Sequence, residues 1–357
     1  MRLQEIVAGI RPVDSAWIER AAAHSARLVM PHRALGRLHA IAEQLCGIGQ
    51  TLRPSVASKA ILVMAADHGV AAAGVSAYPQ EVTGEMVKTF LRGGAAINAI
   101  ARAVGAEVRV VDMGIIPELD PALLDGGDRL RVRKVARGTR NMLRGAAMTR
   151  EQAAEAVLAG FDAAAECFQR GVQLLGTGDM GIGNTTPSAA IGAVLAGRDP
   201  EAMAGRGTGV DADGLRRKRE AIREAIRVNR PDPGDGLDVL AKLGGFEIAA
   251  IAGCALAGAH HRVPVVVDGF ISTAGALIAQ ALCPAVTGYL LAGHRSAEAG
   301  HQAMLDHLGL EPLLDLGMRL GEGTGAALAM SVIQGAVAVF NEVFSFEQAG
   351  VSGKEGG

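Results

Sequence analysis

Five short runs of apolar, often β-branched residues recur along this chain, and each ends in a polar or glycine-rich turn. The runs are Ile61–Ala66, Val108–Val111, Val172–Leu175, Val263–Val267 and Tyr289–Leu291. They lack the alternation of apolar and polar residues that marks a strand with one solvated face, so they predict parallel strands buried on both faces. Helical patterns fill most of the spacers, and strand followed by helix, repeated, predicts an α/β fold of the doubly wound type.

Helices are predicted over residues 81–104, 150–170, 215–228, 245–259, 272–282 and 297–308, the last with Ser296 as its N-cap. The first 58 residues differ, because they hold two helical stretches, 14–30 and 35–52, and no strand. A long apolar helix is also predicted near the other end, over residues 325–341. We therefore expect a large α/β domain with the substrate site over residues 59–302 and a small all-helical domain. The small domain is built from both chain ends: residues 1–58, and residues 303–345, which also carry the candidate catalytic glutamate. Residues 346–357 are predicted to form a flexible tail.

Composition excludes several classes of protein. Lys and Arg number 35 against 37 Asp and Glu, and aromatic residues make up 3% of the chain, so nothing favours binding to nucleic acid. The four cysteines are spread singly, which argues against a disulfide framework or a zinc knuckle and predicts a reduced, cytoplasmic setting. No signal peptide and no apolar run of about 18 residues is apparent, so no membrane span is expected.

The strongest local signal is a glycine-rich loop between the run at Val172–Leu175 and Pro187. Thr186 is the predicted N-cap of the next helix and Pro187 its first residue, so backbone amides and a helix N-terminus would face a small anion such as phosphate. The loop formally contains G-x-G-x-x-G, so a dinucleotide site is an alternative. The nearest acidic residues at the required spacing, Asp199 and Glu201, do not follow a second strand, which weakens that alternative. Glycine used only for close packing of strand and helix is a further alternative.

A second glycine-rich loop, Gly205–Gly209, precedes a basic helix that includes Arg216 and Lys218. Most of these charges are expected on a solvated face. Free amides beside a lysine could also form the second half of a phosphate clamp.

The third segment places Glu322 between glycines, in the sequence Gly321-Glu322-Gly323-Thr324-Gly325. Glycine neighbours allow a ligand to approach the carboxylate, and a single carboxylate in a cleft suits a general base. A capping role at the following helix is the alternative. The histidines, His294 and His301 among them, show no metal-ligand spacing, so no metal is expected. Asp67-His68 is interpreted as structural or as supporting the site.

Six motifs that occur in order make a more specific pattern. They are Asp67-His68-Gly69-Val70, residues 76–83 (SAYPQEVT), residues 183–187 (GNTTP), Asp268-Gly269-Phe270, Ser296-Ala297-Glu298 and residues 318–323 (MRLGEG). With them the chain resembles the nicotinate-nucleotide:5,6-dimethylbenzimidazole phosphoribosyltransferase family over roughly residues 14 to 345.

The resemblance implies a Rossmann-like large domain, a small helical domain, a homodimer and no cofactor. The implied reaction is attack of a benzimidazole nitrogen on the anomeric carbon of nicotinate mononucleotide, which releases nicotinate and forms alpha-ribazole 5'-phosphate for cobamide lower ligands. Glu322 occupies the position of the catalytic glutamate. The residues implied around the mononucleotide are Gly176, Gly178, Asp179, Asn184, Thr185, Gly207, Lys218 and Ser296. Those implied around the base are Tyr78, Pro79, Met86, Leu320 and Gly325.

Two alternatives remain at this point: a non-catalytic protein of the same fold that binds nucleotides or bases, and an NAD-binding oxidoreductase. Some members of the family have serine at the position of Tyr78 and glutamine at that of Met86. A base pocket that is less polar and differently shaped is therefore expected.

Overall fold

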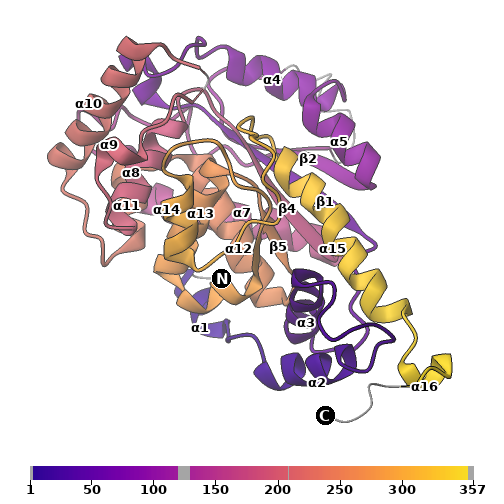
Figure 1. The fold of residues 1–357 in the computed structure, drawn as a ribbon. Coiled ribbons are helices and arrows are strands. Elements are labelled where there is room, and N and C mark those ends of the chain that lie inside the picture. The colour runs from indigo at the N-terminus through magenta and orange to yellow at the C-terminus, as the bar shows by residue number, and fades with distance from the viewer. Residues whose placement is uncertain (1–2, 120–128, 208, 353–357) are drawn as a thin grey trace.

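The chain forms a six-stranded parallel sheet with helices on both faces (Figure 1). The structure is a computed structural model that describes residues 3–119, 129–207 and 209–352. The strands are β1 (Lys59–Ala66), β2 (Ala106–Gly114), β3 (Leu130–Val132), β4 (Leu174–Met180), β5 (Val265–Val267) and β6 (Leu290–Ala292). Their order is β3-β2-β1-β4-β5-β6, and every pairing among them is parallel. The predicted α/β, Rossmann-like fold is confirmed.

The order in which strands are added to the sheet reverses between β1 and β4. The chain first adds β2 and β3 on one side of β1 and then returns to add β4, β5 and β6 on the other. In sheets of this kind ligands bind outside the carboxyl ends of the strands, near the point where the order reverses. β3 escaped prediction because it is an edge strand of three residues with a charged residue, Arg131, at its centre.

The helices of the described part of the chain are α1 (Leu3–Gly9), α2 (Ser15–Ser25), α3 (Arg37–Gly49), α4 (Val82–Leu91), α5 (Ala96–Val104), α7 (Arg150–Gln169), α8 (Thr185–Leu195), α9 (Pro200–Met203), α10 (Ala212–Asn229), α11 (Gly236–Leu243), α12 (Phe246–His261), α13 (Phe270–Leu282), α14 (His301–Leu308), α15 (Thr324–Glu342) and α16 (Phe346–Ala349). Short 3-10 turns lie at η1 (Gly69–Ala73) and η3 (Pro284–Tyr289). α7, α12 and α13 cover one face of the sheet, and α5 and α15 cover the other (Figure 1).

Several helix boundaries and caps differ from prediction. The helix expected over residues 81–104 is two helices, because Gly93 adopts a left-handed conformation (φ +78°) between them. α8 begins at Thr185 after Asn184, so Thr186 is not its N-cap. Pro187 is the third helical residue, where the missing N–H would still have no partner within the helix.

Ser296 is not an N-cap either. α14 starts at His301, and the Ser296 hydroxyl instead accepts a hydrogen bond from the backbone N–H of Glu298 at 3.3 Å. The N–H of Ala297 donates to the carbonyl of Met318 at 2.9 Å. This bond between distant segments keeps residues 297–299 out of the helix.

The core depends on close approach of backbones. α7 and α12 cross where a Cβ on Gly160 would lie 2.0 Å from the carbonyl oxygen of Ala250, and one on Gly253 would lie 2.0 Å from that of Val157. Only glycine permits that separation. The small residues of the sequence therefore make the close helix packing that a composition of 48 Gly suggests.

Segments near the two ends of the chain pair with each other. Leu28 and Ser345 form an isolated antiparallel bridge, and the N–H of Val29 donates to the carbonyl of Phe344 at 2.8 Å. α3 packs against both α2 and α15 at the lower end of the molecule (Figure 1). The division into a large and a small domain stays a prediction. The tail predicted from residue 346 includes α16, while residues 353–357 lie outside the described residues.

α15 is the one helix of the described residues with the length and apolar composition to cross a membrane. Of its most apolar 18-residue window, 56% is buried inside the protein. The core helix of a globular protein has the same character.

Candidate active site

A cleft of about 530 Å³ opens at the carboxyl ends of β4, β5 and β6, between α4 and the loop that precedes α15. Nine of the residues named from the sequence line it: Tyr78, Met86, Asp179, Asn184, Thr185, Gly207, Ser296, Leu320 and Glu322. These residues come from segments far apart in the sequence, from Tyr78 to Glu322. The sheet therefore brings together most of the proposed site.

Five named residues do not line the cleft. Gly176 and Gly178 lie inside β4, where a Cβ would stand 2.3 Å from Cδ1 of Ile61 and 2.4 Å from the carbonyl oxygen of Glu322 respectively. A Cβ on Gly325 would stand 2.0 Å from Nδ1 of His294. These glycines set the spacing of neighbouring segments, which is the packing alternative drawn from the sequence. Pro79 and Lys218 are also absent from the lining.

Lys218 lies directly behind the cleft wall. Its side chain is fully buried, and Nζ donates to Oγ1 of Thr185 at 2.7 Å and to the carbonyl of Gly205 at 3.1 Å. Burial lowers the pKa of Lys218 to about 8, and the nearby Glu298 carboxylate opposes that shift. Thr185 is the first residue of α8, so the helix N-terminus and the lysine both place positive charge at one wall. Arg216, on the same helix as Lys218, is exposed and pairs with Asp213.

Glu322 has an unusual backbone. Gly321, Glu322 and Gly323 all have left-handed φ angles, of +85°, +62° and +91°. A non-glycine residue in this region is strained, and such strain concentrates at functional sites. The N-cap position of α15 is Gly323 and no side-chain cap hydrogen bond is present, so Glu322 does not cap that helix.

The Glu322 carboxylate instead meets another helix. Oε2 accepts a hydrogen bond from the backbone N–H of Ile97, the second residue of α5, at 3.1 Å. The side chain lines the cleft but is 94% buried. Burial and the negative charge of Asp268 raise the pKa of Glu322, while the Ile97 N–H partly opposes this. A carboxylate with a raised pKa is a better proton acceptor than an ordinary one.

Asp179 is the second carboxyl group of the cleft. Burial, and then the charge of Asp268, raise the pKa of Asp179 to about 8, although Nδ2 of Asn184 donates to it at 2.9 Å. The carboxyl group is therefore protonated near neutral pH. It can then donate a hydrogen bond to a substrate oxygen.

Sequence reasoning assigned no role to Asp268, although it lies in one of the six motifs. Its Oδ1 accepts from the N–H of Ala326 at 2.8 Å, and Oδ2 from that of Gly323 at 3.2 Å. The side chain thus ties the end of β5 to the loop that carries Glu322. The position directly after a predicted strand was the available signal.

His294 and His301 were interpreted as core or surface residues. His294 lines the cleft, and its Nδ1 lies 2.9 Å from the Asp268 carbonyl. His301 is buried behind it, with Nδ1 2.8 Å from the Ser296 N–H and Nε2 2.8 Å from the Thr273 hydroxyl. Burial lowers the pKa of His301 to about 3, so the ring is neutral and Nδ1 is free to accept. Glu298 and Arg319 also line the cleft, and Arg319 donates to the Gly207 carbonyl at 3.0 Å.

The dinucleotide alternative does not fit this geometry. A pyrophosphate fingerprint needs its first two glycines in the turn after a strand, whereas Gly176 and Gly178 lie within β4. Asp199 caps α9 by accepting from the Glu201 N–H at 2.9 Å, so it is not placed at the end of a second strand.

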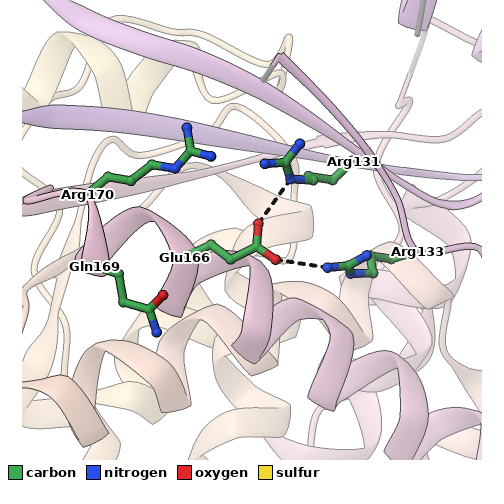
Figure 2. Close-up of a pocket in the computed structure, with 5 residues that line it drawn as sticks. All are labelled: Arg131, Arg133, Glu166, Gln169 and Arg170. Atoms are coloured by element: carbon green, nitrogen blue, oxygen red, sulfur yellow. Dashed lines mark hydrogen bonds and ion pairs between the residues drawn. The ribbon is translucent and has the colours of Figure 1, made fainter. Parts of the chain in front are cut away.

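A second, shallower hollow lies between β3 and the end of α7, apart from the cleft (Figure 2). Both carboxylate oxygens of Glu166 are engaged there, by Nε of Arg131 at 3.0 Å and by a terminal nitrogen of Arg133 at 2.8 Å. Gln169 and Arg170 complete its lining. None of the six motifs contributes to it.

Comparison with known proteins defines the class. A family model described as a phosphoribosyltransferase matches residues 10–351. A crystal structure of nicotinate-nucleotide-dimethylbenzimidazole phosphoribosyltransferase from Thermus thermophilus superposes with a TM-score of 0.89 at 46% identity, covering 96% of this chain and all of that one.

The curated relatives are more specific. Nicotinate-nucleotide–dimethylbenzimidazole phosphoribosyltransferase from Roseiflexus sp. (strain RS-1) is 53% identical over 354 residues, 99% of this chain and 98% of the relative. The protein of the same name from Geobacter metallireducens is 52% identical over 351 residues, 98% of each chain. The chain therefore belongs to the nicotinate-nucleotide–dimethylbenzimidazole phosphoribosyltransferase family, and the resemblance found in its motifs is confirmed.

Proposed function

We propose that this enzyme transfers the phosphoribosyl group of nicotinate mononucleotide to a nitrogen of 5,6-dimethylbenzimidazole or a related base. The bond between the base nitrogen and the anomeric carbon forms as the bond from that carbon to nicotinate breaks. The products are nicotinate and alpha-ribazole 5'-phosphate, the nucleotide of a cobamide lower ligand. The leaving pyridinium becomes neutral as it departs, so departure needs no general acid.

The single observation that carries the mechanism is Glu322, a glycine-framed carboxylate at the cleft wall. The incoming base must lose its N–H proton, and we assign Glu322 as the acceptor. Its negative charge would also stabilise the positive charge that develops on the sugar. The raised pKa of Glu322 supports the assignment.

The cleft wall formed by the start of α8 and its neighbours suits the phosphate of the mononucleotide. We assign the phosphate to the start of α8 at Thr185, backed by Lys218, and to Gly207 and Ser296 nearby. We assign Asn184 and the protonated Asp179 to contacts with ribose oxygens. Gly176 and Gly178 then act through the position of β4 and not by contact.

The base is assigned to the wall formed by Tyr78, Met86 and Leu320. Pro79 and Gly325 would shape this wall from behind, Gly325 through the room it leaves for His294. An apolar wall of this kind suits the flat face of a benzimidazole. We further propose that the enzyme acts as a homodimer in the cytoplasm.

The experiment is mass analysis of the products formed from nicotinate mononucleotide with a panel of bases, using the wild type and Glu322→Gln. The proposal expects a phosphoribosylated base with the wild type. It expects turnover reduced at least about 10²-fold in the variant, with mononucleotide binding retained. Binding without product in the wild type would favour the non-catalytic alternative, and normal turnover in Glu322→Gln would remove that residue from the mechanism.

A further inference from the structure

The carboxylate assigned as the base is held by a helix 225 residues earlier in the sequence. Oε2 of Glu322 accepts the Ile97 N–H at 3.1 Å, and both groups are buried. Among the described residues, Oε1 has no comparable donor, and Glu322 lines the cleft. The direction of the free oxygen therefore depends on where the first turn of α5 lies.

A buried side chain, Asn98, holds that first turn through two hydrogen bonds. Its Oδ1 accepts the N–H of Ala95 at 3.0 Å, and its Nδ2 donates to the carbonyl of Phe90 at 3.1 Å. Asn98 is 92% buried, so neither bond is exchanged freely with water. The side chain closes the turn between α4 and α5, in which Gly93 breaks the helix.

Asn98 contacts both the helix that lines the cleft and the helix that holds Glu322. Phe90 belongs to α4, whose other residues Val82 and Met86 line the cleft. Ile97, next to Asn98, binds Glu322. Asn98 thus joins the wall assigned to the base to the group assigned to take the proton from that base.

We infer that Asn98 is a positioning residue for the reaction: by closing the α4–α5 turn it fixes the Ile97 N–H, and through it the orientation of Glu322. The inference rests on the proposed role of Glu322. Placement within about 1 Å governs rates of this kind, so a modest displacement of α5 is enough to reduce turnover.

Loss of the hydrogen bond from the Ile97 N–H to Glu322 also shifts the pKa of Glu322. The Ile97 N–H stabilises the ionised carboxylate, whereas burial and the charge of Asp268, which follows β5, act against it. Within the part of the chain that the structure describes, α5 contributes one hydrogen bond to Glu322, from the Ile97 N–H. A displaced α5 therefore raises the pKa of Glu322, and the acidic limb of the rate profile moves to higher pH.

The test compares Asn98→Ala and Asn98→Ser with wild type over pH 5 to 9. We expect kcat to fall about tenfold or more in Asn98→Ala, the acidic limb to move upward, and the KM for the base to rise. The KM for nicotinate mononucleotide should stay unchanged, because its phosphate wall lies on α8. The serine hydroxyl can still accept the Ala95 N–H, so that variant should recover part of the rate.

Arg102→Ala is the matched control. Arg102 donates to the carbonyl of Gly93 in the same turn at 3.1 Å but is exposed, and it makes no bond that holds Ile97. The Arg102→Ala variant should lose a little stability and keep the wild-type pH profile of the rate.

Wild-type kcat and pH profile in folded Asn98→Ser and Asn98→Ala, with Glu322→Gln inactive, would overturn the inference alone. An equal upward shift of the acidic limb in Arg102→Ala would also overturn it, since the effect would then follow general loosening. Full turnover in Glu322→Gln would instead overturn the role of Glu322, and the inference with it.

Discussion

Gly178 in β4 lies directly against the backbone of Glu322, so that a Cβ at position 178 would stand 2.4 Å from the Glu322 carbonyl oxygen. The atom that would be displaced belongs to the backbone and not to a flexible side chain. The spacing between the sheet and the loop of the candidate base is therefore set by the absence of one methyl group.

Gly178→Ala should displace that loop, reducing both turnover and stability. We expect a loss of about 1–3 kcal/mol in the free energy of unfolding, the range for overpacked cores, with kcat reduced more than mononucleotide affinity. Urea unfolding and steady-state kinetics measure both. Gly335→Ala is the control, because that glycine lies in α15 with nothing within 4 Å of its added Cβ. It should leave kcat unchanged and stabilise the helix by about 0.5–1 kcal/mol.

Lys218→Met should weaken mononucleotide binding by about tenfold or more, because it removes the positive charge behind the phosphate wall and the charge-assisted hydrogen bond that holds Thr185. Because the pKa of Lys218 is about 8, wild-type affinity should also decline as pH rises above 8. Calorimetric titration at pH 7 and pH 9 measures both effects. Arg216→Met, on the same helix but exposed, should bind as wild type. Equal affinities of wild type and Lys218→Met would remove the lysine from the phosphate site.

Asp179→Asn should flatten the pH dependence of stability. Its carboxyl pKa is raised from 3.8 to about 8 in the folded chain, so the folded state binds the extra proton. The associated stability is fully present below about pH 4 and is lost as pH rises through 8. Wild type should therefore become less stable from pH 5 to pH 9, and the asparagine variant should lose much of that slope. Parallel slopes in urea unfolding would show that Asp179 is ionised in the folded state.

Tyr78→Ser should raise the KM for 5,6-dimethylbenzimidazole while leaving stability nearly unchanged. The side chain lines the cleft yet is 55% exposed, so it contributes apolar surface for a ligand and little to the core. Loss of that surface corresponds to about 1 kcal/mol, or roughly fivefold in KM. Tyr78→Phe keeps the ring and should match wild type. A KM that rises equally in both variants would point to the hydroxyl.

The sequence predicts those parts of the site that are encoded locally. Glu322 and its glycines are adjacent in the chain, and the strand ends at Asp67, Asp179 and Asp268 follow recognisable apolar runs. The contact between Glu322 and Ile97 joins segments 225 residues apart, and nothing in either segment indicates the other.

Gly176 and Gly178 show a second limit of prediction from the sequence. The family resemblance implies that Gly176 and Gly178 lie around the mononucleotide, but β4 continues through both of them. Local pattern does not say where a strand gives way to its loop, and that boundary decides whether a glycine meets a ligand or a neighbouring segment. The prediction of Ser296 as an N-cap was wrong, because the N–H of Ala297 bonds to the carbonyl of distant Met318. The helix therefore begins only at His301.

Asp268 fastens the loop of Glu322 to the end of β5 through two backbone amides, with no substrate required to complete the link. The acid and the strand consequently move as one body. The backbone of the candidate base is therefore preorganised by the sheet itself, before any ligand binds.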